Sequence, residues 1–176
     1  TSIYGVEHTQ VLTPFRVKSD AGAAMLNLAL QDMINPSADK RLEISFGNRM
    51  IRYRDKVMQT KNMETVSNGD IGFVSMVDKD SNFPVTVTFS DNRIKEYSMD
   101  ELGSIDLAYA TTIHKSQGSE FDCVIIPVLS MFYVMLQRAL IYTAITRAKK
   151  KVILVGQKRA LFTAVHRNDT IQRNTI

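Results

Sequence analysis

Two short segments hold most of the side chains in this 176-residue chain that could do chemistry. The first, residues 111–122, is TTIHKSQGSEFD, and the second, residues 142–148, is YTAITRA, with three lysines directly after it. The first segment offers hydrogen-bond donors that suit phosphate oxygens. These donors are Thr112, His114, Lys115 and Ser116. In the second segment, Arg147 falls at the end of a helix-permissive stretch, where an arginine ordinarily complements the helix dipole.

The position of the first segment is more informative than its composition. It lies between two apolar stretches, Ala110–Ile113 and Cys123–Val128, which have the character of buried strands. In α/β sheets, ligands bind at the carboxyl ends of such strands. Composition alone nevertheless favours a solvated loop here, and a plain helix-end charge for Arg147. Neither segment on its own decides a function.

Several other kinds of site are excluded by the sequence. The chain has no G-x-x-x-x-G-K-[ST] and no G-x-G-x-x-G, so it lacks a loop that could cradle a triphosphate by itself. It has one cysteine, and its three histidines lie far apart, so we predict no metal site. The formal net charge of +4 permits nucleic-acid binding but does not argue for it.

The two ends of the chain have the pattern of an α/β domain. A strand is predicted at Thr9–Thr13, then a helix over residues 21–35. After residue 105, buried strands are predicted at Cys123–Val128 and Lys151–Val155, with helices at Met135–Ala148 and Lys158–His166. We expect the apolar residues of the first helix to face the core. They are Met25, Leu26, Leu28, Leu30, Met33 and Ile34.

The middle of the chain changes period. Short strands separated by turn residues are predicted there, at Lys56–Thr60, Gly69–Val77, Val85–Phe89 and Ile94–Tyr97. This spacing indicates a small SH3-like β-barrel over residues 47–104. It would be inserted in a discontinuous α/β domain of residues 1–46 and 105–176, a parallel sheet with helices on both faces.

Taken together and in order, TIHKSQGSEFD and YTAITRA resemble motifs V and VI of superfamily one helicases. The similarity is greatest to the RecD-like branch, which includes the alpha chain of exodeoxyribonuclease V. Other stretches follow the same family pattern: VLTPFR at 11–16, LNLALQDMINP at 26–36, DKVMQTKN at 55–62 and NGDIGFV at 68–74. The arginine of motif IV is not identifiable. The resemblance implies the second RecA-like motor domain of a helicase, carrying an SH3-like insert.

The resemblance also implies roles for individual residues. Arg147 would be catalytic, reaching the γ-phosphate of ATP as an arginine finger does. Gly118 and Glu120 would lie with it at the nucleotide cleft, Glu120 near the ribose. The residues on the DNA side would be Thr13, Thr112, His114, Lys115 and Ser116. On the barrel, Lys56, Lys61 and Arg93 are available to face phosphates.

The function implied is that of an ATP-dependent DNA helicase in recombination or repair, which translocates on single-stranded DNA. The chain begins with Thr1, so we expect a piece of a longer protein whose first RecA-like domain carries the Walker motifs and the Mg²⁺ ligands. Two alternatives stay open: an alpha subunit whose exodeoxyribonuclease partner carries the nuclease, and a nucleic-acid-binding module without ATPase activity. No signal peptide or membrane span is predicted, and we expect a cytoplasmic protein.

Overall fold

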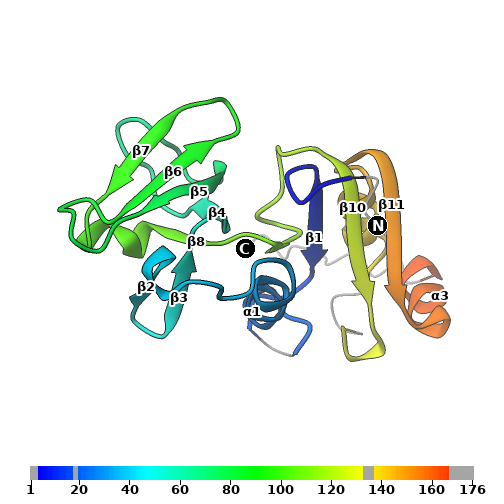
Figure 1. Ribbon diagram of the computed structural model, residues 1–176. Coiled ribbons are helices and arrows are strands. Elements are labelled where there is room, and N and C mark those ends of the chain that lie inside the picture. Colours follow the sequence, from blue (N-terminus) through cyan, green and yellow to red (C-terminus); the bar gives the residue numbers. More distant parts are fainter. Residues whose placement is uncertain (1–3, 18–19, 133–136, 167–176) are drawn as a thin grey trace, which may run out of the picture. The chain divides into compact units, whose positions relative to one another are not determined.

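The computed structural model describes residues 4–17, 20–132 and 137–166 of the chain (Figure 1). The chain forms two compact units. The first is made of residues 1–23 and 111–176, and the second of residues 24–110. The domain boundaries predicted from the sequence, at residues 46/47 and 104/105, stay a prediction.

A mainly parallel sheet forms the centre of the first unit. Its strands are β1 (Thr9–Thr13), β9 (Ala110–Thr112), β10 (Phe121–Val128) and β11 (Ala148–Gly156), in the order β11-β10-β1-β9. β1 and β11 both run parallel to β10, with Thr9 opposite Cys123 and Val124 opposite Val152. The continuous apolar run of β10 is largely buried, as a strand between two neighbours requires. The predicted parallel α/β sheet is therefore confirmed.

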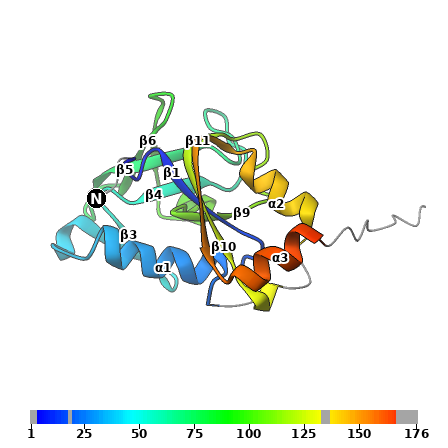
Figure 2. The ribbon, with the colours of Figure 1, turned by 90° about the vertical axis from the view of Figure 1, so that its right-hand side faces the viewer.

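Two helices pack beside this sheet. α2 (Arg138–Ile145) contacts β10 and β11, and α3 (Lys158–His166) contacts α2 (Figure 2). A short 3-10 helix, η3 (Ser130–Phe132), follows β10. The bounds of α3 agree with the prediction. α2 begins at Arg138, and the residues 133–136 that the predicted helix also included lie outside the described residues.

β11 differs from its prediction as a buried strand. Leu154 is 40% exposed and Val155 is 53% exposed. β11 stands at the end of the strand order and pairs only with β10 among the strands that the structure describes. An edge strand lacks one of the two neighbours that bury a central strand, which explains the exposure.

The second unit contains the predicted barrel. A five-stranded antiparallel sheet has the order β7-β6-β5-β4-β8, and a separate hairpin joins β2 to β3. Its strands are β2 (Glu43–Phe46), β3 (Arg49–Arg52), β4 (Lys56–Gln59), β5 (Ile71–Val77), β6 (Val85–Phe89), β7 (Ile94–Tyr97) and β8 (Ile105–Leu107). Two 3-10 helices, η1 (Lys40–Leu42) and η2 (Asp100–Ser104), precede β2 and β8. Alternation along β6 buries Val85, Val87 and Phe89 in the barrel core.

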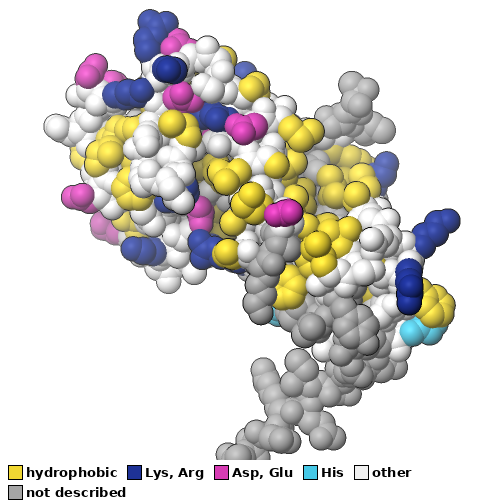
Figure 3. All heavy atoms as spheres, turned by 90° about the horizontal axis from the view of Figure 1, so that it is seen from below, with side chains coloured by type: hydrophobic (Ala, Val, Ile, Leu, Met, Phe, Trp, Pro, Cys, Tyr) yellow, Lys and Arg dark blue, Asp and Glu magenta, His cyan; other side chains and the backbone are white. Residues whose placement is uncertain are grey.

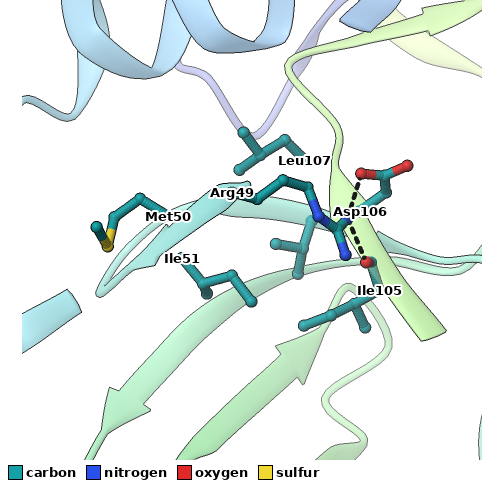
Figure 4. Close-up of a pocket in the computed structure, with 7 residues that line it drawn as sticks. Arg49, Met50, Ile51, Ile105, Asp106 and Leu107 are labelled. Carbon is teal, nitrogen blue, oxygen red and sulfur yellow. Dashed lines mark hydrogen bonds and ion pairs between the residues drawn. The ribbon is translucent and has the colours of Figure 1, made fainter. Parts of the chain in front are cut away.

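The β2–β3 hairpin is attached to β8 by one arginine. Arg49 donates to the carbonyl oxygen of Ile105 at 3.0 Å and forms an ion pair with Asp106 (Figure 4). Met50, Ile51 and Leu107 complete the apolar lining of a small hollow beside this contact.

Helix α1 (Ala23–Ile34) buries a different face from the predicted one. Met25 is 48% exposed, Leu28 42% and Met33 80%, so the expectation that its apolar residues form core was wrong for these positions and for Ile34. The buried residues are Ala23, Asn27 and Gln31, spaced four apart on one helix face. Figure 3 shows apolar side chains exposed on the face of the molecule seen from below.

The polar residues on that buried face of α1 have specific partners. The Asn27 amide donates to the carbonyl oxygens of Leu107 and Ala110 and accepts from the Ala110 N–H at 2.7 Å. Gln31 donates to the carbonyl oxygen of Met50 at 2.9 Å and to the Asp55 carboxylate. These hydrogen bonds offset the cost of burying amides and give the helix a fixed register in the second unit.

Two of the three barrel cations expected to face phosphates are buried or paired with carboxylates instead. Lys56 is 1% exposed, and Arg93 forms ion pairs with Asp70 and Asp91. Lys61 is exposed. Among the described residues, Lys61 is the member of this set that has an exposed side chain and forms no ion pair.

Among the described residues, none of the helices has the length and apolar character that crossing a membrane requires.

Candidate nucleotide and DNA site

Arg147 directly follows the C-cap of α2, and its backbone is anchored to the start of β10. Its N–H donates to the carbonyl oxygen of Ala144 at 3.2 Å, and its own carbonyl accepts from the N–H of Phe121 at 2.8 Å. One residue further on, Ala148 pairs with Phe121 as β11 begins. The sharp passage from helix to strand therefore holds the Arg147 side chain beside the end of the loop that precedes β10.

The loop between β9 and β10, residues 113–120, is held by consecutive turns. The Thr112 hydroxyl accepts from the N–H of Lys115 at 3.2 Å, and the Thr112 carbonyl accepts from the N–H of Ser116 at 3.1 Å. The Ser116 hydroxyl donates to the carbonyl of Ile113 at 2.8 Å. The Ser116 carbonyl then accepts from the N–H of Ser119 at 3.0 Å. The loop is thus a folded structure with defined internal contacts.

The guanidinium of Arg147 lies against this loop. Nη1 donates to the carbonyl oxygen of Ser119 at 3.3 Å, and Nη2 lies 3.5 Å from the Thr146 hydroxyl. Nε is buried and has no acceptor in the part of the chain that the structure describes. A guanidinium carries five N–H donors, so most of its donor capacity is unused here. The structure brings Arg147 and the first segment together, although they are remote in sequence.

The residues assigned to DNA by resemblance are not equally accessible. His114 and Lys115 are exposed, and Thr112 is half-buried. Thr13 is fully buried and its hydroxyl donates to the carbonyl of Ala21 at 2.8 Å, while its own carbonyl accepts from the N–H of Ile113 at 3.0 Å. Ser116 is 1% exposed. The exposed pair can reach a ligand directly, whereas Thr13 and Ser116 hold the loop in place.

The acidic end of the loop pairs with the lysines that open β11. Glu120 forms an ion pair with Lys149 at 3.5 Å, and both side chains are more than half exposed. Asp122 pairs with Lys150 at 2.9 Å and lies 3.8 Å from the Nδ1 of His8. The hydrogen bond from Lys150 lowers the pKa of Asp122 below its usual value.

Two contacts of this site could not be predicted from the sequence: the one at Ser119 and the ion pairs of the two acidic residues. The Ser119 contact uses a backbone carbonyl, which residue type does not reveal. The pairing of Glu120 and Asp122 with Lys149 and Lys150 depends on the register of β10 against β11. Alternating acidic residues in one strand and a run of lysines in the next predict such ion pairs only once that register is known.

Comparison with known proteins gives two family matches on different parts of the chain. Residues 107–155 match the UvrD-like helicase C-terminal domain. Residues 26–89 match the SH3 domain of ATP-dependent RecD-like DNA helicases. The first match covers the 113–120 loop and Arg147, and the second covers α1 and most of the barrel strands.

Relatives of known kind agree with these matches. The ATP-dependent RecD2 DNA helicase of Deinococcus radiodurans is 38% identical over 153 residues, which is 86% of this chain and 20% of that protein. The RecBCD enzyme subunit RecD of Mycobacterium tuberculosis is 44% identical over 66 residues, 38% of this chain and 12% of that protein. The chain therefore spans a small part of the length of these relatives.

Solved structures show the same fold at low sequence identity. The Pif1 helicase of Candida albicans has a TM-score of 0.57 at 17% identity, covering 87% of this chain and 46% of that one. A Bacteroides Pif1 structure bound to single-stranded DNA has a TM-score of 0.54 at 17% identity, covering 83% of this chain and 40% of that one. These structures show the fold, and the two family matches with the RecD2 relative show that the chain corresponds to a C-terminal part of RecD-like DNA helicases.

Proposed function

We propose that this chain is the second motor domain, with its SH3-like insert, of an ATP-dependent helicase that translocates on single-stranded DNA. The observation that carries the proposal is the contact of Arg147 with the 113–120 loop. An arginine with unused donors beside a loop with exposed imidazole and ammonium groups suits a site that binds the phosphates of a nucleotide and of DNA. The longer protein would work in DNA recombination or repair, in the cytoplasm.

The assignments to nucleotide and DNA follow from this arrangement. Arg147, with Gly118 and Glu120, would face ATP held by the first RecA-like domain, which would also supply the Mg²⁺ ligands. Mg²⁺ would offset the negative charge of the phosphates. No metal-ligand group of histidine, cysteine or carboxylate side chains occurs among the described residues.

The DNA side of the loop would be contacted chiefly through two exposed side chains. His114 and Lys115 would meet the DNA backbone directly, because both are exposed at the loop surface. Thr112, Ser116 and Thr13 would support them through the hydrogen bonds that shape the loop and fix it to β1. Contacts of this kind position a protein on DNA without reading its sequence.

A helicase acting alone is favoured over a subunit of a nuclease complex. The match to RecD2 extends over 86% of this chain, whereas the match to a RecBCD subunit extends over 38%. The barrel match is also to the RecD-like helicase SH3 domain. Partner exodeoxyribonuclease subunits remain the second candidate, which co-purification from the native host would reveal.

The test compares the 176-residue chain with the full-length protein. The chain alone should not release phosphate from ATP, because it lacks a triphosphate-binding loop. The full-length protein should hydrolyse ATP with Mg²⁺, be stimulated by single-stranded DNA, and lose this activity with EDTA. Robust turnover by the 176-residue chain, or a full-length protein indifferent to DNA, would contradict the proposal.

A further inference from the structure

Gly118 has a backbone conformation that other residue types rarely adopt. Its φ is +89°, in the left-handed region. A Cβ built on Gly118 would meet no atom within 4 Å. Glycine is therefore required here by the turn of the backbone and not by crowding. That turn sets the path of the chain into Ser119, whose carbonyl lies in the peptide group after the next.

Ser119 is hydrogen-bonded through both its backbone N–H and its backbone carbonyl. Its N–H donates to the carbonyl of Ser116 at 3.0 Å, which ties it to the 113–120 loop. Its carbonyl accepts from Nη1 of Arg147 at 3.3 Å. The turn at Gly118 thus leads the chain into the position in which the Ser119 carbonyl meets the guanidinium of Arg147.

The contact with Ser119 orients the guanidinium of Arg147 and uses only part of its hydrogen-bond donors. Ser119 takes one donor of Arg147, and the Thr146 hydroxyl lies at the long distance of 3.5 Å from another. Nε stays buried without an acceptor among the described residues. A guanidinium fixed at one edge keeps its other donors for an incoming oxyanion, and orientation of this kind lowers a barrier before the reaction begins.

We propose that the Gly118–Ser119 segment is a positioning element for Arg147: the left-handed turn at Gly118 directs the chain so that the Ser119 carbonyl holds the guanidinium ready for the γ-phosphate. The inference rests on the proposed function of Arg147. It gives Gly118 a role through Arg147 in addition to its place at the nucleotide cleft.

The experiment substitutes Gly118 in the full-length protein and measures steady-state ATP hydrolysis with saturating single-stranded DNA. Gly118→Ala and Gly118→Val should lower kcat by about 10- to 100-fold, with the larger loss for valine, because a misdirected group can cost that much and a branched side chain tolerates positive φ least. Gly118→Asn should keep most of kcat, since asparagine tolerates this region. KM for ATP and DNA affinity should not change.

Two control variants separate positioning from general strain. Gly69, in the barrel, has a φ of +102° and also has no atom within 4 Å of a built Cβ. Gly69→Ala therefore imposes a similar backbone strain far along the chain and should leave kcat within twofold. Gly47→Ala, at a φ of +60° and also with no atom within 4 Å of a built Cβ, should likewise leave kcat within twofold.

A double-mutant cycle completes the test. In an Arg147→Lys background, Gly118→Ala should cost much less than in the wild type, since the group that it positions is gone. A raised KM with unchanged kcat, equal losses for Gly118→Ala and Gly69→Ala, or additive losses in the cycle would each overturn the inference. Normal turnover by Gly118→Val beside an inactive Arg147→Ala would overturn it alone, whereas normal turnover by Arg147→Ala would overturn the proposed function as well.

Discussion

Arg147 and Asp55 are ionisable side chains held in opposite ways. Asp55, in the second unit, is 0% exposed and accepts four hydrogen bonds, from Gln31, Asn35, the Arg52 N–H and the Tyr109 hydroxyl. Arg147, in the first unit, has one clear hydrogen bond and a buried Nε without an acceptor among the described residues.

The difference separates a structural group from a candidate functional one. A buried polar group with all its partners stabilises a particular packing, whereas one with missing partners raises the energy of the free protein until a ligand supplies them. Asp55 links α1 to the turn before β4 and to the chain after β8, so its loss should affect folding. Loss of Arg147 should affect turnover.

The largest effect is expected from Arg147→Ala in the full-length protein. DNA-stimulated ATP hydrolysis should fall by roughly 10³–10⁵ in kcat, the range for arginine fingers in related phosphoryl transfer. Arg147→Lys should not restore it, because a point charge lacks the planar fork. Single-stranded DNA binding should stay nearly intact.

The matched control for this loss is Arg159→Ala, which removes an exposed arginine of α3. Phosphate release and fluorescence-anisotropy titration of DNA give the two readouts. Near-normal turnover by Arg147→Ala would mean that Arg147 is only a charge at the end of α2. Arg147 would then be a structural residue, as Asp55 is.

Asp55→Ala should reverse the pattern. It removes the acceptor of four hydrogen bonds, two of them buried and two part-buried, at roughly 1–3 kcal/mol for each buried donor that finds no other partner, so the free energy of unfolding should fall by several kcal/mol. Urea unfolding followed by circular dichroism measures this loss. Asp80→Ala, at an exposed turn, should stay within about 0.5 kcal/mol of wild type. A stable Asp55→Ala protein would show that the network rearranges freely.

The sequence predicted the fold better than the contacts within it. Strand periods and turn residues gave β1, β6, β7 and α3 with the observed bounds, because these depend on local preferences. The buried face of α1 was missed, since Asn27 and Gln31 become suitable for burial only through partners 19 to 83 residues away. No local pattern records such partners.

The site shows the same division. Residue types alone favoured a solvated loop and a helix-end charge at Arg147, and only the family resemblance joined the two segments into one site. Which side chains are exposed was not predictable, because burial of Thr13 and Ser116 follows from how the loop folds back on β1 and on itself. The Arg147–Ser119 contact required the β10–β11 register, which places the end of α2 beside the loop.

A smaller effect tests the DNA side of the loop. The double variant His114→Ala and Lys115→Ala should weaken single-stranded DNA binding by the full-length protein. The slope of log affinity against log salt should shrink by roughly 0.7 for each lost phosphate contact. A salt slope equal to that of wild type would remove both residues from the DNA contact.

The smallest effect is the pH dependence of the Asp55 network. Burial raises the pKa of Asp55 above its usual value, although the hydrogen bonds from Asn35, Arg52, Tyr109 and Gln31 oppose the shift. Between the ordinary and the raised pKa, the folded state binds more protons than the unfolded state, so this group's contribution to stability is present at low pH and is lost as pH rises through the raised pKa.

Other carboxylates titrate in the same range, and hydrogen bonds and ion pairs lower the pKa values of Asp39 and Asp122, which makes their contributions fall on acidification. The Asp55→Asn variant isolates one group, because it removes that titration alone. The free energy of unfolding of wild type minus that of Asp55→Asn should therefore increase as the pH is lowered from 7 towards the ordinary aspartate pKa of about 3.9. A difference that stays flat, or decreases, would mean that the four hydrogen bonds hold the carboxylate ionised in the folded state, and that Asp55 is stabilised as an anion by neutral donors alone.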